Sequence, residues 1–226
     1  MSLTVVFDLD GTLAETAPDL IDALNHVLAF DGIEAVPVAA ARSLLGAGGR
    51  ALIQRGYARA GRELSPQRLD ELFGTFLAFY NDHIADKSTL FPGVRDCLER
   101  CRGEGWRLAV CTNKMEYSSK LLLEKLDALD YFAFVCGQDT FGVAKPNPKP
   151  LVETVARSGG SLGRSLMIGD SVTDIHTARA AGMPVIAVDF GYTDVPVADL
   201  GPDKVISHFD ELYEAVLSLT APARTA

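Results

Sequence analysis

The chain has 226 residues, of which 48% are hydrophobic and 23% are charged, and no segment is biased enough to suggest disorder. Its net charge of −9 disfavours binding to nucleic acid or to an anionic membrane. The same charge repels an anionic substrate, so any phosphate site has to supply positive charge locally. The chain has no apolar run of the roughly 18 residues that span a bilayer and no signal peptide at residues 1–7. Its four cysteines are interpreted as buried free thiols, and we therefore expect a cytoplasmic protein.

The first predicted strand is the apolar run at residues 4–7, and similar runs follow at 107–111, 132–136, 165–168, 185–188 and 204–206. Amphipathic segments of helical length lie among the later strands, at 94–102, 116–126, 150–157 and 173–180. Continuous apolar strands are typical of a parallel sheet that is covered by helices on both faces. The alternation therefore predicts an α/β fold with a Rossmann-like, doubly wound parallel sheet.

Residues 14–87 interrupt this alternation, because they show only helical patterns, at 18–29, 38–44, 50–60 and 66–84. Ser65 followed by Pro66 is typical of a helix start. We therefore predict a discontinuous core of residues 1–14 and 88–226, with an inserted helical unit of residues 15–87. The end of the chain from Thr220 onward is expected to be frayed.

Ligands of open α/β sheets bind beyond the carboxyl ends of the strands, and the sequence places a polar cluster at four such ends. The first is Asp8-Leu9-Asp10-Gly11, in which the two-residue period of extended backbone directs both carboxylates to one side. The second is Thr112-Asn113, where a hydroxyl and the following backbone N–H can hold phosphate oxygens. Each has a simpler interpretation, since the first is also a common polar turn and the second a common helix cap.

The third cluster is Lys145-Pro146, in which proline stiffens the loop that carries the lysine. The fourth is Gly169-Asp170 with Asp174 one helical turn later, a pair of carboxylates that suits a hard cation. Taken alone, Lys145 is a solvated loop charge and Asp170 is a helix cap. A shared phosphate site is the better interpretation because all four clusters follow strands of one predicted sheet.

These four clusters resemble, in order, the four motifs of the haloacid dehalogenase superfamily of aspartate-nucleophile phosphatases. The resemblance covers nearly the whole chain, and no core position departs from the pattern. Residues 15–87 are similar to the C1-type helical cap of that family. The resemblance implies a Mg2+-dependent phosphomonoester hydrolase that forms an aspartyl-phosphate and acts on a small phosphorylated metabolite.

By the resemblance, Asp8 is the nucleophile, and Asp10 is the general acid and then the general base. Thr112 and Asn113 hold phosphoryl oxygens together with Lys145, which also assists catalysis through its charge. Neighbouring carboxylates are expected to help keep a proton on Asp10.

The same resemblance places Mg2+ on Asp8, on Asp170 and on the backbone carbonyl of Asp10. Asp174 then orients water or Lys145. A cation is also needed on electrostatic grounds, since two unit charges ~4 Å apart interact by roughly 4 kcal/mol at an effective dielectric of ~20.

The segment of residues 42–50 resembles the cap loop of bacterial phosphoglycolate phosphatases, and Phe91-Pro92-Gly93-Val94 and Phe190-Gly191-Tyr192 are similar to theirs as well. Its residues Gly46, Gly48 and Arg50 are therefore expected to bind the substrate carboxylate through backbone N–H groups and a guanidinium. The simpler interpretation is a turn that is followed by a solvated arginine.

The leading hypothesis is the hydrolysis of 2-phosphoglycolate to glycolate and phosphate. Asp10 argues against a dehalogenase, and the absence of lysine between Ala14 and Asp86 argues against a phosphonate-cleaving relative. A phosphatase for nucleotides or sugar phosphates and a β-phosphoglucomutase-like phosphomutase stay open, with a silent phosphate-binding scaffold as a remote alternative. No linear motif defines an oligomeric state.

Overall fold

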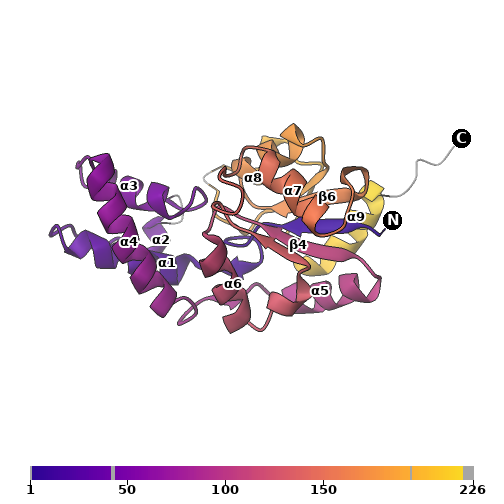
Figure 1. Cartoon of the computed structure of the whole chain (residues 1–226), viewed down its shortest axis with the longest axis horizontal. Coiled ribbons are helices and arrows are strands. Elements are labelled where there is room, and N and C mark those ends of the chain that lie inside the picture. The colour runs from indigo at the N-terminus through magenta and orange to yellow at the C-terminus, as the bar shows by residue number, and fades with distance from the viewer. Residues whose placement is uncertain (1, 42–43, 194, 221–226) are drawn as a thin grey trace, which may run out of the picture.

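A central sheet of six parallel strands lies at the core of the larger part of the molecule (Figure 1). The strands are β1 (Thr4–Phe7), β4 (Arg107–Cys111), β5 (Phe134–Cys136), β6 (Ser165–Gly169), β7 (Val185–Val188) and β8 (Lys204–Ile206). Their order across the sheet is β5-β4-β1-β6-β7-β8. The chain order therefore reverses beside β1, which creates a crevice at the carboxyl ends of the strands, and the predicted doubly wound fold is confirmed.

Helices cover both faces of this sheet. One face carries α5 (Val94–Gly103), α6 (Glu116–Lys125) and α9 (Leu212–Thr220), and the other carries α7 (Lys149–Arg157) and α8 (Val172–Ala180). Val5 and Phe7 of β1 belong to the first of these cores, and Val6 belongs to the second. Because side chains alternate along a strand, a strand that is buried on both faces has to be apolar throughout, which is the pattern that predicted it.

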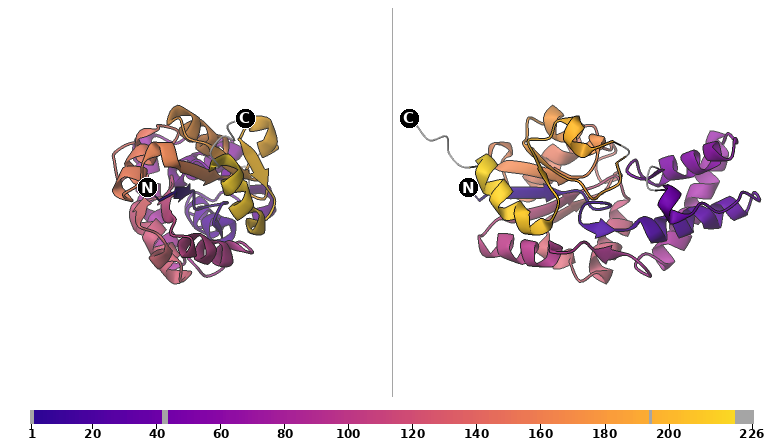
Figure 2. Two further views of the ribbon diagram at one scale, coloured as in Figure 1. Left: turned by 90° about the vertical axis from the view of Figure 1, so that its right-hand side faces the viewer. Right: turned by 180° about the vertical axis from the view of Figure 1, so that it is seen from behind.

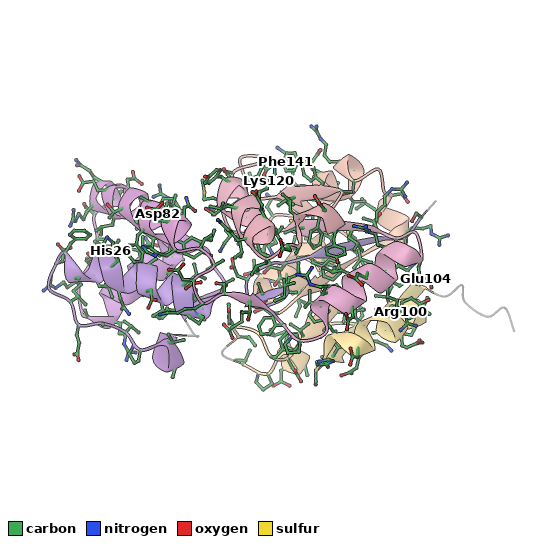
Figure 3. All side chains as sticks on the ribbon, turned by 90° about the horizontal axis from the view of Figure 1, so that it is seen from below. His26, Asp82, Arg100, Glu104, Lys120 and Phe141 are labelled. Carbon is green, nitrogen blue, oxygen red and sulfur yellow. The ribbon has the colours of Figure 1, made fainter. Side chains whose placement is uncertain are left out.

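The structure, a computed structural model, describes residues 2–41, 44–193 and 195–220. Beyond the carboxyl ends of the strands lie α1 (Ala17–Ala29), α2 (Val38–Ala41), α3 (Gly49–Arg59) and α4 (Pro66–Asp82). These four helices stand apart from the sheet in Figure 1 and in the right view of Figure 2. Figure 3 places His26 and Asp82 on this helical part, and Arg100 and Glu104 at the opposite end of the molecule. Ser65 caps α4 as predicted, since its Oγ accepts from the backbone N–H of Arg68 at 3.2 Å.

A short antiparallel ribbon, β2 (Ala14–Glu15) with β3 (Thr89–Leu90), carries the chain into and out of the four helices. The sequence did not predict this ribbon, because strands of two residues are too short to show a periodic pattern. Helix α9 was also not predicted. The strand predicted from residue 132 begins at Phe134, since residues 129–131 form a 3₁₀ turn, and the helix predicted to residue 84 ends at Asp82.

Residues 42 and 43 of the helix predicted at 38–44, and the predicted frayed end from residue 221 onward, lie outside the described residues. All four cysteines are free and buried, as predicted. Among the described residues, no helix combines the length and apolar character that crossing a membrane requires.

Asp19 of α1 ties the helical part to the segment that leads into β3. Its carboxylate is 2% exposed and accepts from the backbone N–H groups of Lys87 (3.1 Å) and Ser88 (2.8 Å) and from the Ser88 hydroxyl (2.7 Å). We expect Asp19→Ala to lower the free energy of unfolding by about 2–4 kcal/mol, because it leaves buried donors unpaired. Urea unfolding measures this loss.

The matched control is Asp22→Ala on the same helix, which removes only a half-exposed ion pair with Lys87 Nζ. Its loss should be much smaller, since exposed ion pairs contribute little. Equal losses in the two variants would contradict the role assigned to Asp19.

Candidate active site

The polar clusters from the four strand ends meet at the crevice beside β1. Asp8 follows β1, Thr112 follows β4, Asp170 follows β6, and Lys145 lies on the loop between β5 and α7. The Thr12 hydroxyl donates to Asp170 Oδ1 at 2.9 Å and so joins the first cluster to the fourth. The structure therefore assembles one site from segments more than 150 positions apart in the sequence.

Lys145 lies between two carboxylates. Its Nζ is 2.9 Å from Asp8 Oδ1 and 2.6 Å from Asp174 Oδ1, and only 2% of its side chain is exposed. Burial opposes its charge, but Asp174 and Asp8 outweigh this and raise the pKa of Lys145 above its ordinary value. The Asn113 side chain fixes the loop, because its Oδ1 accepts from Lys145 N (2.9 Å) and its Nδ2 donates to Lys145 O (3.0 Å).

Asp170 and Asp174 have different surroundings. Asp174 uses both oxygens within the protein: Oδ1 binds Lys145, and Oδ2 accepts from the backbone N–H groups of Asp170 (3.3 Å) and Ser171 (3.1 Å). Ser171 is thus the N-cap of α8 and forms a capping box with Asp174, so Asp170 is not the helix cap. Asp170 Oδ2 accepts from the backbone N–H of Tyr192 at 2.7 Å.

The arrangement fits a divalent cation. Asp8, Asp170 and Asp174 each offer an oxygen within 4.8 Å of the others, and Asp8 Oδ1 is buried without a hydrogen bond although Lys145 Nζ is near. Burial, with the opposing effect of Lys145 and the supporting effect of Asp174, raises the pKa of Asp8 from 3.8 to about 6. Burial and the two neighbouring carboxylates raise the pKa of Asp170 well above its ordinary value. A hard cation with oxygen ligands would relieve this repulsion.

Asp10 is in contact with a lysine that the sequence analysis missed. Lys114 Nζ donates to both Asp10 oxygens, at 2.8 and 2.9 Å, and Thr16 Oγ1 donates to Oδ1 at 2.7 Å. Asp10 therefore has a cationic partner as well as a hydroxyl donor. The sequence offered one indication of this contact: Lys114 lies two residues after Thr112, within the same strand-end cluster.

The family model for haloacid dehalogenase-like hydrolases matches residues 5–188. The chain belongs to this family. The phosphoglycolate phosphatase of Mesorhizobium japonicum is 50% identical over 208 residues, which is 92% of each chain. The phosphoglycolate phosphatase of Caulobacter vibrioides is 43% identical over 96% of this chain and 91% of its own.

Two solved structures agree with the fold of this haloacid dehalogenase-like protein. A predicted phosphoglycolate phosphatase from Haemophilus somnus has a TM-score of 0.88 and 27% identity, covering 95% of this chain and 97% of that one. CbbY from Rhodobacter sphaeroides, in complex with phosphate, has a TM-score of 0.81 and 25% identity, covering 96% and 100%. The resemblance inferred from the four clusters is thereby confirmed.

Tyr192 connects the haloacid dehalogenase-like core to the helical part. Its backbone binds Asp170, while its hydroxyl accepts from the backbone N–H groups of Thr16 (2.7 Å) and Ala17 (2.9 Å) and bonds to Glu15 Oε1 (2.6 Å). Gly11 permits this packing: a Cβ there would lie 2.6 Å from Asp170 Oδ2, and its φ of +80° suits only glycine. The sequence analysis included Tyr192 in a segment similar to that of related phosphatases but predicted no contact for it.

The glycine-rich loop before α3 reaches the core. Gly46 and Gly48 line a pocket that Asp8, Asp10, Thr112 and Asn113 also line. Gly48 lies so close that a Cβ would come 3.0 Å from Asn113 O.

Arg50 is placed differently from these glycines. It is half exposed, pairs with Asp70 and stacks on Phe73 at 4.5 Å, and it does not line the pocket. Arg42 and Ser43 of the same predicted loop lie outside the described residues.

The carboxylate cluster predicts a stabilising effect of Mg2+. At a concentration about 100-fold above Kd, Mg2+ should raise the melting temperature by about 5–10 °C, because it binds the folded site and not the unfolded chain. Differential scanning fluorimetry measures the shift. Asp170→Asn should lose most of it and the exposed Asp70→Asn should keep it, whereas an unchanged melting temperature of the native protein would contradict a cation site.

Proposed function

We propose that the protein is a Mg2+-dependent phosphatase that hydrolyses 2-phosphoglycolate to glycolate and phosphate through an aspartyl-phosphate on Asp8. One observation carries the mechanism: the buried Asp8 carboxylate lies on the pocket, paired with Lys145, and Asp10 lines the same pocket. Family membership and relatives at up to 50% identity support a phosphoric monoester hydrolase. We also propose that residues 15–87 act as a cap domain and that the enzyme is cytoplasmic.

In the first step, an Asp8 oxygen attacks phosphorus, and the bond from phosphorus to the ester oxygen breaks. Asp10 donates a proton to the departing oxygen, which leaves as the hydroxyl of glycolate. Lys145 stabilises the charge on the phosphoryl group, while the Thr112 hydroxyl and the backbone N–H of Asn113 hold its oxygens. The side chain of Asn113 instead fixes Lys145.

In the second step, water attacks phosphorus and Asp10 accepts a proton from it. The bond between phosphorus and Asp8 breaks, so that phosphate is released and the Asp8 carboxylate is restored. Asp174 keeps Lys145 in place through the 2.6 Å contact.

Asp8, Asp170 and the backbone carbonyl of Asp10 are the groups that we propose to hold Mg2+. The cation supplies positive charge that offsets the repulsion between the carboxylates and the phosphate. Both Asp174 oxygens already accept hydrogen bonds, which supports a positioning role for that residue.

The chemistry of the pocket supports a small substrate. Its lining from the helical part is mainly apolar, with Leu45, Leu52, Phe73 and Phe76 among the described residues. Such a wall offers few partners to the hydroxyls of a sugar, and unpaired polar groups are costly to bury. The names of the relatives at 50% and 43% identity point to the same ester.

A panel of phosphate esters tests the substrate. We expect kcat/KM for 2-phosphoglycolate to exceed that for nucleotide and hexose phosphates by at least about 100-fold, since polar specificity of this kind reaches 10⁴-fold or more in other enzymes. Steady-state phosphate release at saturating Mg2+ measures it. A preference for a nucleotide or sugar phosphate, or isomerisation of a sugar phosphate, would contradict the proposal in favour of the other phosphatase or the phosphomutase.

The nucleophile is tested by Asp8→Asn. The amide should reduce kcat on the order of 10⁴-fold or more, because removal of a nucleophile abolishes the covalent path. Acid-quenched labelling with ³²P-substrate should mark the native enzyme and not the variant, while circular dichroism confirms its fold. Substantial turnover by the folded variant would show that Asp8 does not attack.

A further inference from the structure

The pocket is lined by a buried tyrosine hydroxyl. Tyr80 of α4 is 1% exposed and lines the pocket, and its Oη makes no hydrogen bond with any described group. Burial raises the pKa of Tyr80 to about 12 against the opposing effect of the nearby Lys114 ammonium, so the hydroxyl keeps its proton and is a donor. An unpaired buried hydroxyl is costly, and one that lines a binding pocket indicates a partner that arrives with the ligand.

The Tyr80 hydroxyl belongs to the cap side of the pocket, and Lys114 faces it from the core. Lys114 Nζ lies 4.6 Å from the centre of the Tyr80 ring and 2.8 Å from Asp10 Oδ1. Of the residues that line the pocket in the described part of the chain, Lys114 alone is basic. Its charge therefore lies against both Asp10 and the face of the Tyr80 ring.

Other polar side chains on this wall are already engaged. Ser118 donates its hydroxyl to Asn81 Oδ1 at 2.7 Å, and the Gln138 amide contacts Met115 Sδ at 3.1 Å. Much of the remaining wall is apolar. Tyr80 and Lys114 are thus the two side-chain donors best placed to bind an anionic group near Asp10.

We propose that Tyr80 Oη and Lys114 Nζ bind the carboxylate of the substrate, so that Tyr80 is a specificity-determining residue. This rests on the proposed function, because in 2-phosphoglycolate a single methylene separates the leaving oxygen from the carboxylate carbon. A substrate whose leaving oxygen contacts Asp10 therefore brings its carboxylate beside Lys114. The pair of donors would bind a short anionic ester more tightly than a neutral one, since a neutral group of the same shape cannot form the charged contact.

The test compares 2-phosphoglycolate with its carboxamide analogue, 2-phosphoglycolamide, which has nearly the same shape without the charge. In Tyr80→Phe, the ratio of kcat/KM for the carboxylate to that for the carboxamide should fall about 10- to 100-fold, because a hydrogen bond to a charged group is lost. Most of the change should appear in KM. Lys114→Gln should reduce the ratio as well, and should also slow both esters because Lys114 contacts Asp10.

Tyr57→Phe is the matched control, because it makes the same chemical change in the same helical part. Tyr57 is buried, but its hydroxyl donates to Asp31 Oδ2 at 2.6 Å and it does not line the pocket. It should leave the ratio unchanged and lower the melting temperature. Tyr80→Phe should not lower the melting temperature, since the hydroxyl has no partner to lose.

Two results would overturn the inference. If the native enzyme prefers the carboxylate and Tyr80→Phe keeps that preference, the carboxylate binds elsewhere, and the proposed function stands without this subsite. If Tyr80→Phe lowers the melting temperature as much as Tyr57→Phe, with equal losses for both esters, the hydroxyl serves the fold alone. A native enzyme that does not prefer 2-phosphoglycolate in the ester panel refutes the proposed function itself.

Discussion

The structure depends on keeping three buried carboxylates together at the carboxyl ends of β1 and β6. Asp8, Asp170 and Asp174 each offer an oxygen within 4.8 Å of the others, a spacing at which like charges repel by several kcal/mol at an effective dielectric of ~20. Lys145 offsets part of this through its contacts with Asp8 and Asp174. Burial, together with the remaining excess of negative charge, raises the pKa of Asp8 and Asp170, and a divalent cation would offset that excess.

The same cluster is connected mechanically to the helices that cover it. Tyr192 binds Asp170 through its backbone and the start of α1 through its hydroxyl, so one residue contacts both a proposed metal ligand and the first of the four helices. Asp19 attaches the returning strand to the same helix. Both strands of the ribbon that joins the four helices to the core are therefore attached to α1.

Much of the fold and the main site residues followed from local patterns. Buried parallel strands have to be apolar on both faces, which made all six strands visible, and Ser65 with Pro66 marked a helix start. The strand ends then placed Asp8, Thr112 and Asp170 on one edge of the sheet, while Lys145 reaches it from the loop between β5 and α7. The ribbon of β2 and β3 escaped prediction, because its two-residue strands depend on pairing between positions 14 and 90 rather than on any local pattern.

The sequence by itself determined the fold class, the family and the residues at the four strand ends, because these are written in periodicity and in short contiguous motifs. Only the tertiary structure decided which charges and hydroxyls face one another. It paired Lys114 with Asp10, left the Tyr80 hydroxyl unpaired in the pocket, and turned Arg50 away to Asp70. These outcomes depend on how the four helices α1 to α4 pack against the core. Contacts between distant segments produce no local pattern in a single sequence.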